Sequence, residues 1–153
     1  MGKTTRGPAA GNAVTAALQA ALVDLIALAL QGKQLHWNVT GPQFAPLHLL
    51  FDTFVTEQRL WYDTVAERLR ALGDAADGRA VALATARAAE LPAGLIRDTD
   101  AITAAATRTR AVAAGIRGAL DAVGAADLVT QDLLIGIVDG LEKEAWMLEA
   151  QGG

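Results

Sequence analysis

The segment from Gln43 to Leu72 constrains the fold of this chain more than any other. Its large apolar residues recur every three or four positions, as on one face of a helix, and they are Leu47, Leu50, Phe51, Phe54, Trp61, Val65, Leu69 and Leu72. Gly41-Pro42 precedes the segment and Gly73 follows it, and such residues typically separate helices. The spacing predicts one long helix.

A second helix is predicted before this one. It runs from Asn12, expected as the N-cap, to about Trp37, and residues 1–11 form a tail of small and turn residues. Its apolar stretch, Ala13 to Leu30, resembles a secretory signal or a membrane span. However, Asp24 interrupts this stretch and the apolar pattern continues beyond it. We therefore expect a buried bundle helix, no membrane association and a cytoplasmic protein.

The C-terminal half predicts two more long helices. One starts near Asp98 or Asp100 and ends at Gly124, with an inward face of Ile102, Ala105, Thr109, Val112, Ile116, Leu120 and Val123. The other is capped by Asp127, and its expected inward residues are Leu128, Ile135, Val138, Leu141 and Leu148.

Length and composition fit one helical domain. At 153 residues the chain is large enough for a proper core, and 52% apolar with 5% aromatic content favours closely packed helices. The connection 74–94 contains a stretch, 80–89, that is long enough for a short helix. So long a connection is expected when the second and third long helices lie parallel. The sequence thus predicts an all-α four-helix bundle over residues 12–150.

Five potential metal ligands, including both histidines of the chain, lie close together in the sequence: His36, His48, Asp52, Asp63 and Glu67. Imidazole combined with carboxylate suits a first-row transition metal such as iron, and the chain has no cysteine. Singly, each histidine is more often a cap or core residue, and Asp63 with Glu67 would pass as a solvated helix face. A manganese or zinc site that blocks iron also stays open, because ligand type alone does not fix the metal.

Helix geometry divides these ligands into two half-sites. At 1.5 Å per residue, His48 and Asp63 lie about 22 Å apart along one helix, which is too far for one metal centre. His48 with Asp52, and Asp63 with Glu67, are i, i+4 pairs on one broad side of the helix. His36, at the end of the preceding helix, can return through the turn to join the first pair.

A twofold axis near Glu57 and Gln58 would unite the two half-sites. Two copies of the helix packed antiparallel about this axis place the first half-site of one chain against the second half-site of the other. The resulting dimer contains two identical sites.

Several short motifs between Asn12 and Ala150 match one known family together. They are Lys33-Gln34-Leu35-His36-Trp37-Asn38-Val39, Leu47-His48, Phe51-Asp52, Asp63-x-x-Ala66-Glu67-Arg68, Leu72-Gly73, Leu141-Glu142-Lys143 and Trp146-Met147-Leu148. With these motifs the chain resembles the Dps family, the mini-ferritins named as DNA-binding proteins from starved cells. The Glu-x-x-His pairs of the larger ferritins occur nowhere in the sequence.

The resemblance implies a ferritin-like bundle with a ferroxidase site shared between subunits. His36, His48 and Asp52 would come from one subunit, and Asp63 and Glu67 from its twofold mate. The resemblance also implies a hollow dodecamer, built from twofold dimers, that oxidises Fe(II) with hydrogen peroxide or dioxygen. Peroxide is the expected oxidant, and the ferric product would be stored as an oxyhydroxide mineral, which protects against oxidative damage.

Two further sets of residues, three aspartates and two tryptophans, each have more than one expected role. Asp127, Asp132 and Asp121 surround the start of the last helix, where family members line threefold pores with acids. An N-cap role for Asp127 and surface solvation for the other two are equal alternatives. Trp37 and Trp61 could quench stray oxidising equivalents, but a packing role is favoured for both.

The tails do not match the DNA binding that the family name implies. Lys3, Arg6 and the α-amino group are the only cations of the N-terminal tail, and residues 149–153 include no basic residue. At −4 per chain, a shell of twelve carries about −48 and repels duplex DNA at physiological salt. We expect weak or no DNA binding. A nucleoid-associated shell that compacts DNA with little iron turnover is the alternative function.

Overall fold

The protein, seen in a computed structural model, is an all-α bundle, as the sequence predicts. The structure describes residues 11–87 and 90–152. Its long helices are α1 (Asn12–Asn38), α2 (Phe44–Ala71), α3 (Asp98–Ala126) and α4 (Leu128–Glu149). A 3₁₀ helix, η1 (Ala80–Thr85), lies between α2 and α3, and two short parallel strands pair with each other, β1 (Val39–Thr40) and β2 (Ile96–Arg97).

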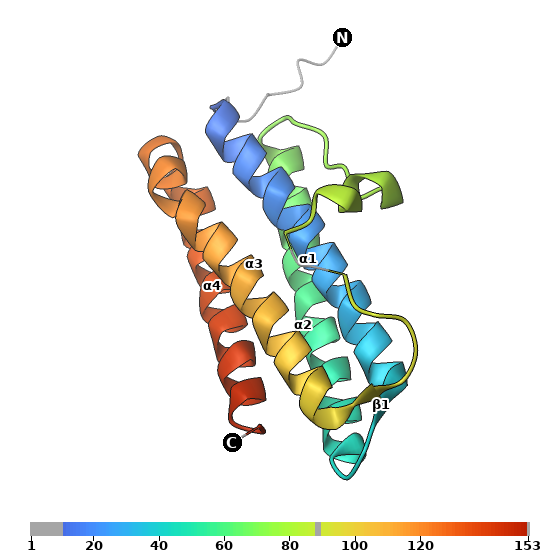
Figure 1. Ribbon diagram of the computed structural model, residues 1–153. Coiled ribbons are helices and arrows are strands. Elements are labelled where there is room, and N and C mark those ends of the chain that lie inside the picture. The colour runs from blue at the N-terminus through green and yellow to red at the C-terminus, as the bar shows by residue number, and fades with distance from the viewer. Residues whose placement is uncertain (1–10, 88–89, 153) are drawn as a thin grey trace.

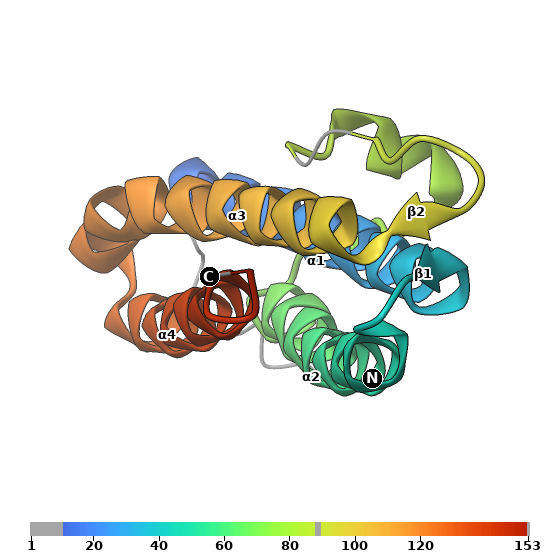
Figure 2. The ribbon, with the colours of Figure 1, turned by 60° about the horizontal axis from the view of Figure 1, so that its bottom comes forward.

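The four helices form two packed pairs. α1 packs along α2, α3 packs along α4, and α1 also contacts α3. α1 and α4 run in one direction while α2 and α3 run in the other (Figure 1). The connection between α2 and α3 returns along the bundle past α1, and Figure 2 shows β2 beside β1 where it ends. This long return allows α2 and α3 to lie parallel, as predicted.

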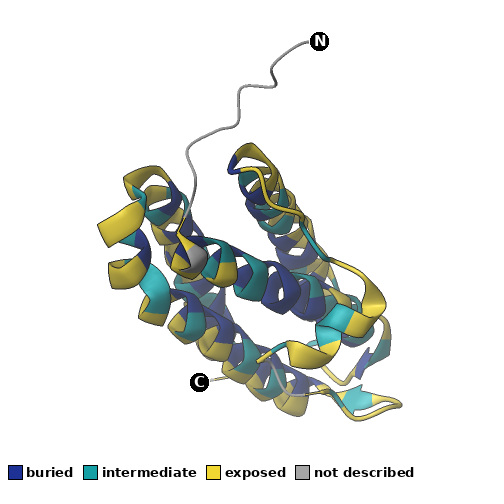
Figure 3. Ribbon diagram, turned by 90° about the horizontal axis from the view of Figure 1, so that it is seen from above, coloured by how far each residue is buried: buried dark blue, intermediate teal, exposed yellow. Residues whose placement is uncertain are grey.

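The inward faces of the four helices form the core (Figure 3). One cluster of buried side chains fills the bundle near the start of α1 and the end of α2. A second cluster lies under the α1–α2 turn and contains Leu35, Val39, Leu47, Phe51, Phe54, Ala101, Ile102, Ala105, Ala106 and Leu148. Each large apolar side chain buried in this way contributes about 1.5–3 kcal/mol. The second cluster therefore gives the α1–α2 turn a rigid base.

Helix α1 is a core helix of the bundle, as expected. It is long and apolar enough to cross a membrane, but 56% of its most apolar 18-residue stretch is buried against the rest of the chain. Asp24 on this helix is also buried, and it accepts a hydrogen bond from the backbone N–H of Arg87 at 2.7 Å. Burial raises the pKa of Asp24, and the Arg87 guanidinium, 2.7 Å away, opposes that rise.

Two predicted helix ends are wrong. Gly11 is the N-cap of α1, and Asn12 is already helical. α3 continues through Gly124 to Ala126, because Gly124 leaves room for the side chain of Gln131 instead of ending the helix. By contrast, Gly73 has the positive φ of 94° that ends α2 as predicted.

The predicted inward face of α4 is partly wrong. Leu128 and Ile135 are 71% and 47% exposed, whereas Val138, Leu141 and Leu148 are buried as predicted. Leu134 and Ile137 also belong to the buried stripe. The short helix in the crossover is a 3₁₀ helix that ends at Thr85, earlier than the predicted range 80–89, whose residues 88–89 lie outside the described chain. The predicted tail, except Gly11, also lies outside the described residues.

Candidate metal site

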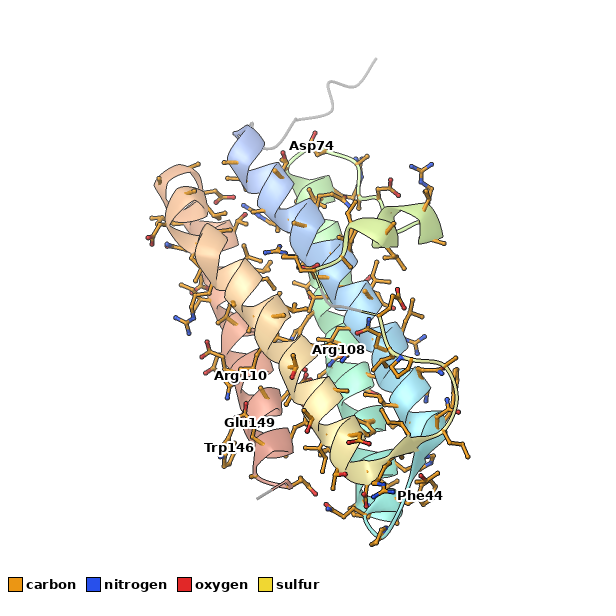
Figure 4. The ribbon with its side chains drawn as sticks, viewed as in Figure 1. Phe44, Asp74, Arg108, Arg110, Trp146 and Glu149 are labelled. Atoms are coloured by element: carbon orange, nitrogen blue, oxygen red, sulfur yellow. The ribbon has the colours of Figure 1, made fainter. Side chains whose placement is uncertain are left out.

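His36 and His48 face each other across the α1–α2 turn. His36 lies in the last turn of α1 and His48 in the first turns of α2. Their rings are stacked, with centroids 3.7 Å apart and an angle of 17° between the planes. The ring of Phe44, labelled in Figure 4 at this end of the bundle, lies 5.1 Å from the His48 ring.

Reciprocal hydrogen bonds fix both imidazoles. His36 Nδ1 lies 2.6 Å from the carbonyl oxygen of His48, and His48 Nδ1 lies 2.7 Å from the carbonyl oxygen of His36. Because a carbonyl oxygen only accepts, the Nδ1 atom of each ring must carry the proton. With Nδ1 protonated, Nε2 is the nitrogen of each ring that can bind a metal, and the ring orientation is set in advance.

The stacking favours two metal positions over one. Two nearly parallel rings 3.7 Å apart cannot direct their in-plane lone pairs at a single ion at a bonding distance of about 2 Å. Each imidazole can instead bind an ion of its own. The ring spacing also falls within the roughly 3.5–4 Å that separates the ions of two-metal sites.

Asp52 follows His48 by one turn of α2, and its carboxylate is paired with Lys33. Lys33 Nζ donates a hydrogen bond to Asp52 Oδ1 at 2.6 Å, and it also lies 5.9 Å from the centre of the Trp37 ring. The hydrogen bond from Lys33 is the main cause that lowers the pKa of Asp52, and the positive charge of Lys33 lowers it further. Sequence reasoning missed Lys33, although its i, i+3 spacing to His36 places both on one side of α1.

Asp63 and Glu67 form an exposed acidic pair further along α2. Within the described part of the chain, neither side chain makes a hydrogen bond or an ion pair. Across residues 11–87 and 90–152, no three histidine, aspartate or glutamate side chains lie close enough to hold one ion. In a single chain, therefore, Asp52 does not join the histidine pair in a three-ligand group, and the acidic pair lies apart from both.

Between these two regions, Gln58 points into the bundle while Glu57 stays exposed. Gln58 Nε2 donates a hydrogen bond to Glu144 Oε2 at 2.8 Å, and both side chains are buried. Burial raises the pKa of Glu144 to about 8; the Gln58 bond opposes the rise and Glu57 adds to it. Sequence reasoning missed this acid, although it lies between Leu141 and Leu148 on the buried stripe of α4.

Asp127 is the N-cap of α4, one of its two predicted roles. It accepts hydrogen bonds from the backbone N–H of Val129 at 3.1 Å and from Arg68 Nη2 at 2.7 Å. The Thr130 hydroxyl and Arg68 lower the pKa of Asp127 to about 2. Asp121 and Asp132 are exposed near the α3–α4 junction.

The two tryptophans differ in their surroundings. Trp61 packs against the core, and its ring lies so close to Gly140 on α4 that a side chain at that glycine would collide with it. A packing role therefore accounts for Trp61. Trp37 is 66% exposed in the single chain, so its predicted packing would need a partner beyond this chain.

Comparisons with known proteins agree with this architecture. A sequence model of the ferritin-like domain matches residues 15–153. The structure of Dps from Microbacterium arborescens in the high iron form aligns with a TM-score of 0.86 and 34% identity, over 95% of this chain and 98% of that one. A DNA protection during starvation protein of Brevibacillus brevis is 32% identical over 90% of this chain and 93% of its own length. This chain belongs to the Dps family.

Relatives of this Dps-family chain carry more than one name. The fine tangled pili major subunit of Haemophilus ducreyi is 35% identical over 93% of this chain and 76% of its own length. Matches to DNA protection during starvation proteins of Deinococcus radiodurans and Agrobacterium fabrum span less than half of those relatives' lengths. Family membership thus fixes the bundle but does not by itself fix the function.

Proposed function

We propose that this chain is a ferroxidase and iron-storage mini-ferritin whose complete sites form between two copies. The observation that carries the proposal is the locked histidine pair, which presents two Nε2 lone pairs beside a carboxylate. Neutral imidazole and carboxylate bind Fe(II), the substrate, and leave positions open for an oxidant. The stacked rings favour two iron ions per site.

The acidic pair of a second chain would complete each site. The region around His48 carries Lys33 and two imidazoles, whereas Asp63 and Glu67 are exposed carboxylates on the same broad side of α2. Leu49 and Leu60 also lie on that side and are more than half exposed, as expected of residues covered in an assembly. An antiparallel α2–α2 contact about a twofold axis near Glu57 buries these leucines and joins the halves.

Two iron ions bound together would let hydrogen peroxide react without releasing hydroxyl radical. Each Fe(II) gives one electron, the O–O bond breaks, and two protons complete two molecules of water. The Fe(III) product then hydrolyses and is stored in a shell, for which we infer twelve subunits as in the family. The iron named for the Microbacterium arborescens relative supports iron as the metal. We further infer a cytoplasmic protein with weak or no DNA binding, since each chain carries −4.

Rapid-mixing measurements of Fe(II) oxidation with peroxide or with dioxygen test this proposal. Asp63→Ala should slow oxidation at least about 100-fold, more than the roughly 10–100-fold that loss of a ligand's supporting hydrogen bond costs. Asp139→Ala, which removes an exposed acid from α4, is the matched control and should oxidise iron normally. Equal rates for wild type and Asp63→Ala would refute the site.

A further inference from the structure

We propose that Asp98, at the start of α3, is a positioning residue for the metal site. Its buried carboxylate holds the α1–α2 turn and thereby keeps the imidazoles of His36 and His48 locked against each other. The consequence for iron rests on the function proposed above. The effect on the two rings does not, and it can be measured separately.

The Asp98 carboxylate binds the start of two helices at once. The side chain is 4% exposed. Oδ2 accepts a hydrogen bond from the backbone N–H of Gln43, the N-cap of α2, and Oδ1 accepts one from Thr99 in α3, both at 2.9 Å. N–H groups at helix starts lack partners within the helix, and the positive ends of both helix dipoles favour a carboxylate there. Asp98 thus ties α2 to α3.

Gly41 in the α1–α2 turn is shaped to fit this carboxylate. Its φ of 116° lies in the region that favours glycine. A Cβ atom at this position would also lie 2.7 Å from the carboxyl group of Asp98. The turn and the acid therefore contact each other closely, with no room for another side chain between them.

The two short strands bring Asp98 to the turn. Val39 pairs with Ile96, and Thr40 pairs with Arg97, in a parallel bridge. The Thr40 hydroxyl donates a further hydrogen bond to the carbonyl oxygen of Ile96 at 3.2 Å. Asp98 follows directly and reaches Gln43, 55 residues away in the sequence. The turn between the two histidines is thus held by the end of the crossover.

The locked imidazoles depend on this turn. Their reciprocal bonds of 2.6 and 2.7 Å require one fixed offset between the end of α1 and the start of α2, and the short segment 39–43 sets that offset. If the turn shifts, each Nδ1 loses its carbonyl partner, and the tautomer protonated at Nε2 becomes populated. That tautomer has no Nε2 lone pair for a metal. Loss of Asp98 should therefore weaken metal binding without removing a ligand.

The test compares Asp98→Ala and Asp98→Asn with Asp100→Ala, an exposed acid in the same first turn of α3. The first readout is ¹⁵N NMR of the assembled protein labelled at histidine, because the chain has only two histidines. The second is affinity for Zn(II), a probe without redox chemistry. Asp98→Ala should lose the Nδ1-protonated signals and bind Zn(II) roughly 10–100-fold more weakly. Asp98→Asn keeps a hydrogen-bond acceptor, so its histidine signals and Zn(II) affinity should change less. Asp100→Ala should change neither readout.

Unchanged ring signals and wild-type Zn(II) affinity in assembled Asp98→Ala protein would overturn the proposal. If that variant does not assemble, Asp98→Asn decides, and wild-type behaviour in both of its readouts would equally overturn it. The two proposals fail in different ways. Fe(II) oxidation that survives Asp63→Ala refutes the ferroxidase site, while the tautomer signals still report whether Asp98 holds the rings.

Discussion

The potential ligands at the two ends of α2 differ in how firmly the folded chain holds them. At its start, His48 is held by a carbonyl of α1, Asp52 by Lys33 and the preceding turn by Asp98. Toward its end, Asp63 and Glu67 are exposed and lack partners in the described part of the chain. Folding of one chain therefore orders the histidine region, whereas Asp63 and Glu67 gain no such contacts in the described part of one chain. This difference is what a site shared between two chains requires.

The largest expected effect comes from mixing two inactive chains. His48→Ala and Asp63→Ala should each lose Fe(II) oxidation, because each removes one half of every site. When both are co-expressed with different tags, a mixed dimer keeps one complete site, since its two substitutions fall on the other site. Random pairing makes half of the dimers mixed, so about one quarter of the wild-type activity should return.

Purification through both tags in succession should retain this recovered activity, because a shell of twelve randomly mixed chains contains both variants. Co-expression of His48→Ala with Asp52→Ala is the matched control. Both substitutions affect the same half-site, so no mixed dimer contains a complete site and activity should stay low. Recovery in this control, or no recovery in the first mixture, would contradict a shared site.

A second effect concerns the acid behind the middle of α2, between the two regions. The pKa of Glu144 is raised from 4.5 to about 8, so the folded chain holds a proton that the unfolded chain releases across that range. This contribution to the free energy of unfolding therefore falls as pH rises from about 4.5 to about 8 and is constant above. Glu144→Gln removes the titration but can still accept the Gln58 bond. Compared with its effect at pH 4.5, this substitution should raise the free energy of unfolding at pH 8.5 by on the order of 2–4 kcal/mol.

Chemical denaturation of both proteins at equal concentration, at pH 4.5 and pH 8.5, measures this difference. Asp139→Asn, which neutralises an exposed acid on the same helix, is the control and should leave the pH dependence unchanged. If wild type and Glu144→Gln lose stability in parallel as pH rises, Glu144 does not hold its proton in the folded state.

The smallest expected effect concerns the Lys33–Asp52 ion pair near the start of α2. Lys33→Ala frees Asp52 Oδ1 and removes a positive charge beside the incoming cation. Zn(II) affinity should therefore rise, but only roughly two- to five-fold, because exposed ion pairs are weak. Titration calorimetry with Zn(II) checks this, with the exposed Lys143→Ala as control. Weaker binding by Lys33→Ala would instead show that the lysine orients the carboxylate.

The fold was largely predictable because its signals are local. The apolar stripe of α2 and Gly73, with φ of 94°, predicted that helix and its end correctly. The outward positions of Leu128 and Ile135 could not be predicted in the same way. Apolar residues occur on several sides of α4, and periodicity alone does not separate a side buried in the core from one covered by another chain.

Sequence spacing predicted that His36 would lie beside His48, but it did not predict the geometry of the pair. The positions of His48 and Asp63 in the sequence predicted their separation along one helix, because the rise per residue is a local property of a helix. The tautomers, the Lys33 pair and the Asp98 contact all depend on segments that meet only after folding. Asp98 in particular is predicted by sequence only as a residue near the start of a helix, and its bond to Gln43 depends on the β1–β2 pairing.

The contact between Gln43 and Asp98 has a consequence for the chain during synthesis. Synthesis from the N-terminus makes both histidines before Asp98, the residue that holds their turn and lies 55 positions after Gln43. A nascent α1–α2 hairpin therefore contains the imidazoles without their fixed orientation. On the function proposed above, iron capture would wait until the crossover has closed on the bundle, so an unfinished chain would be a poor place for iron to meet peroxide.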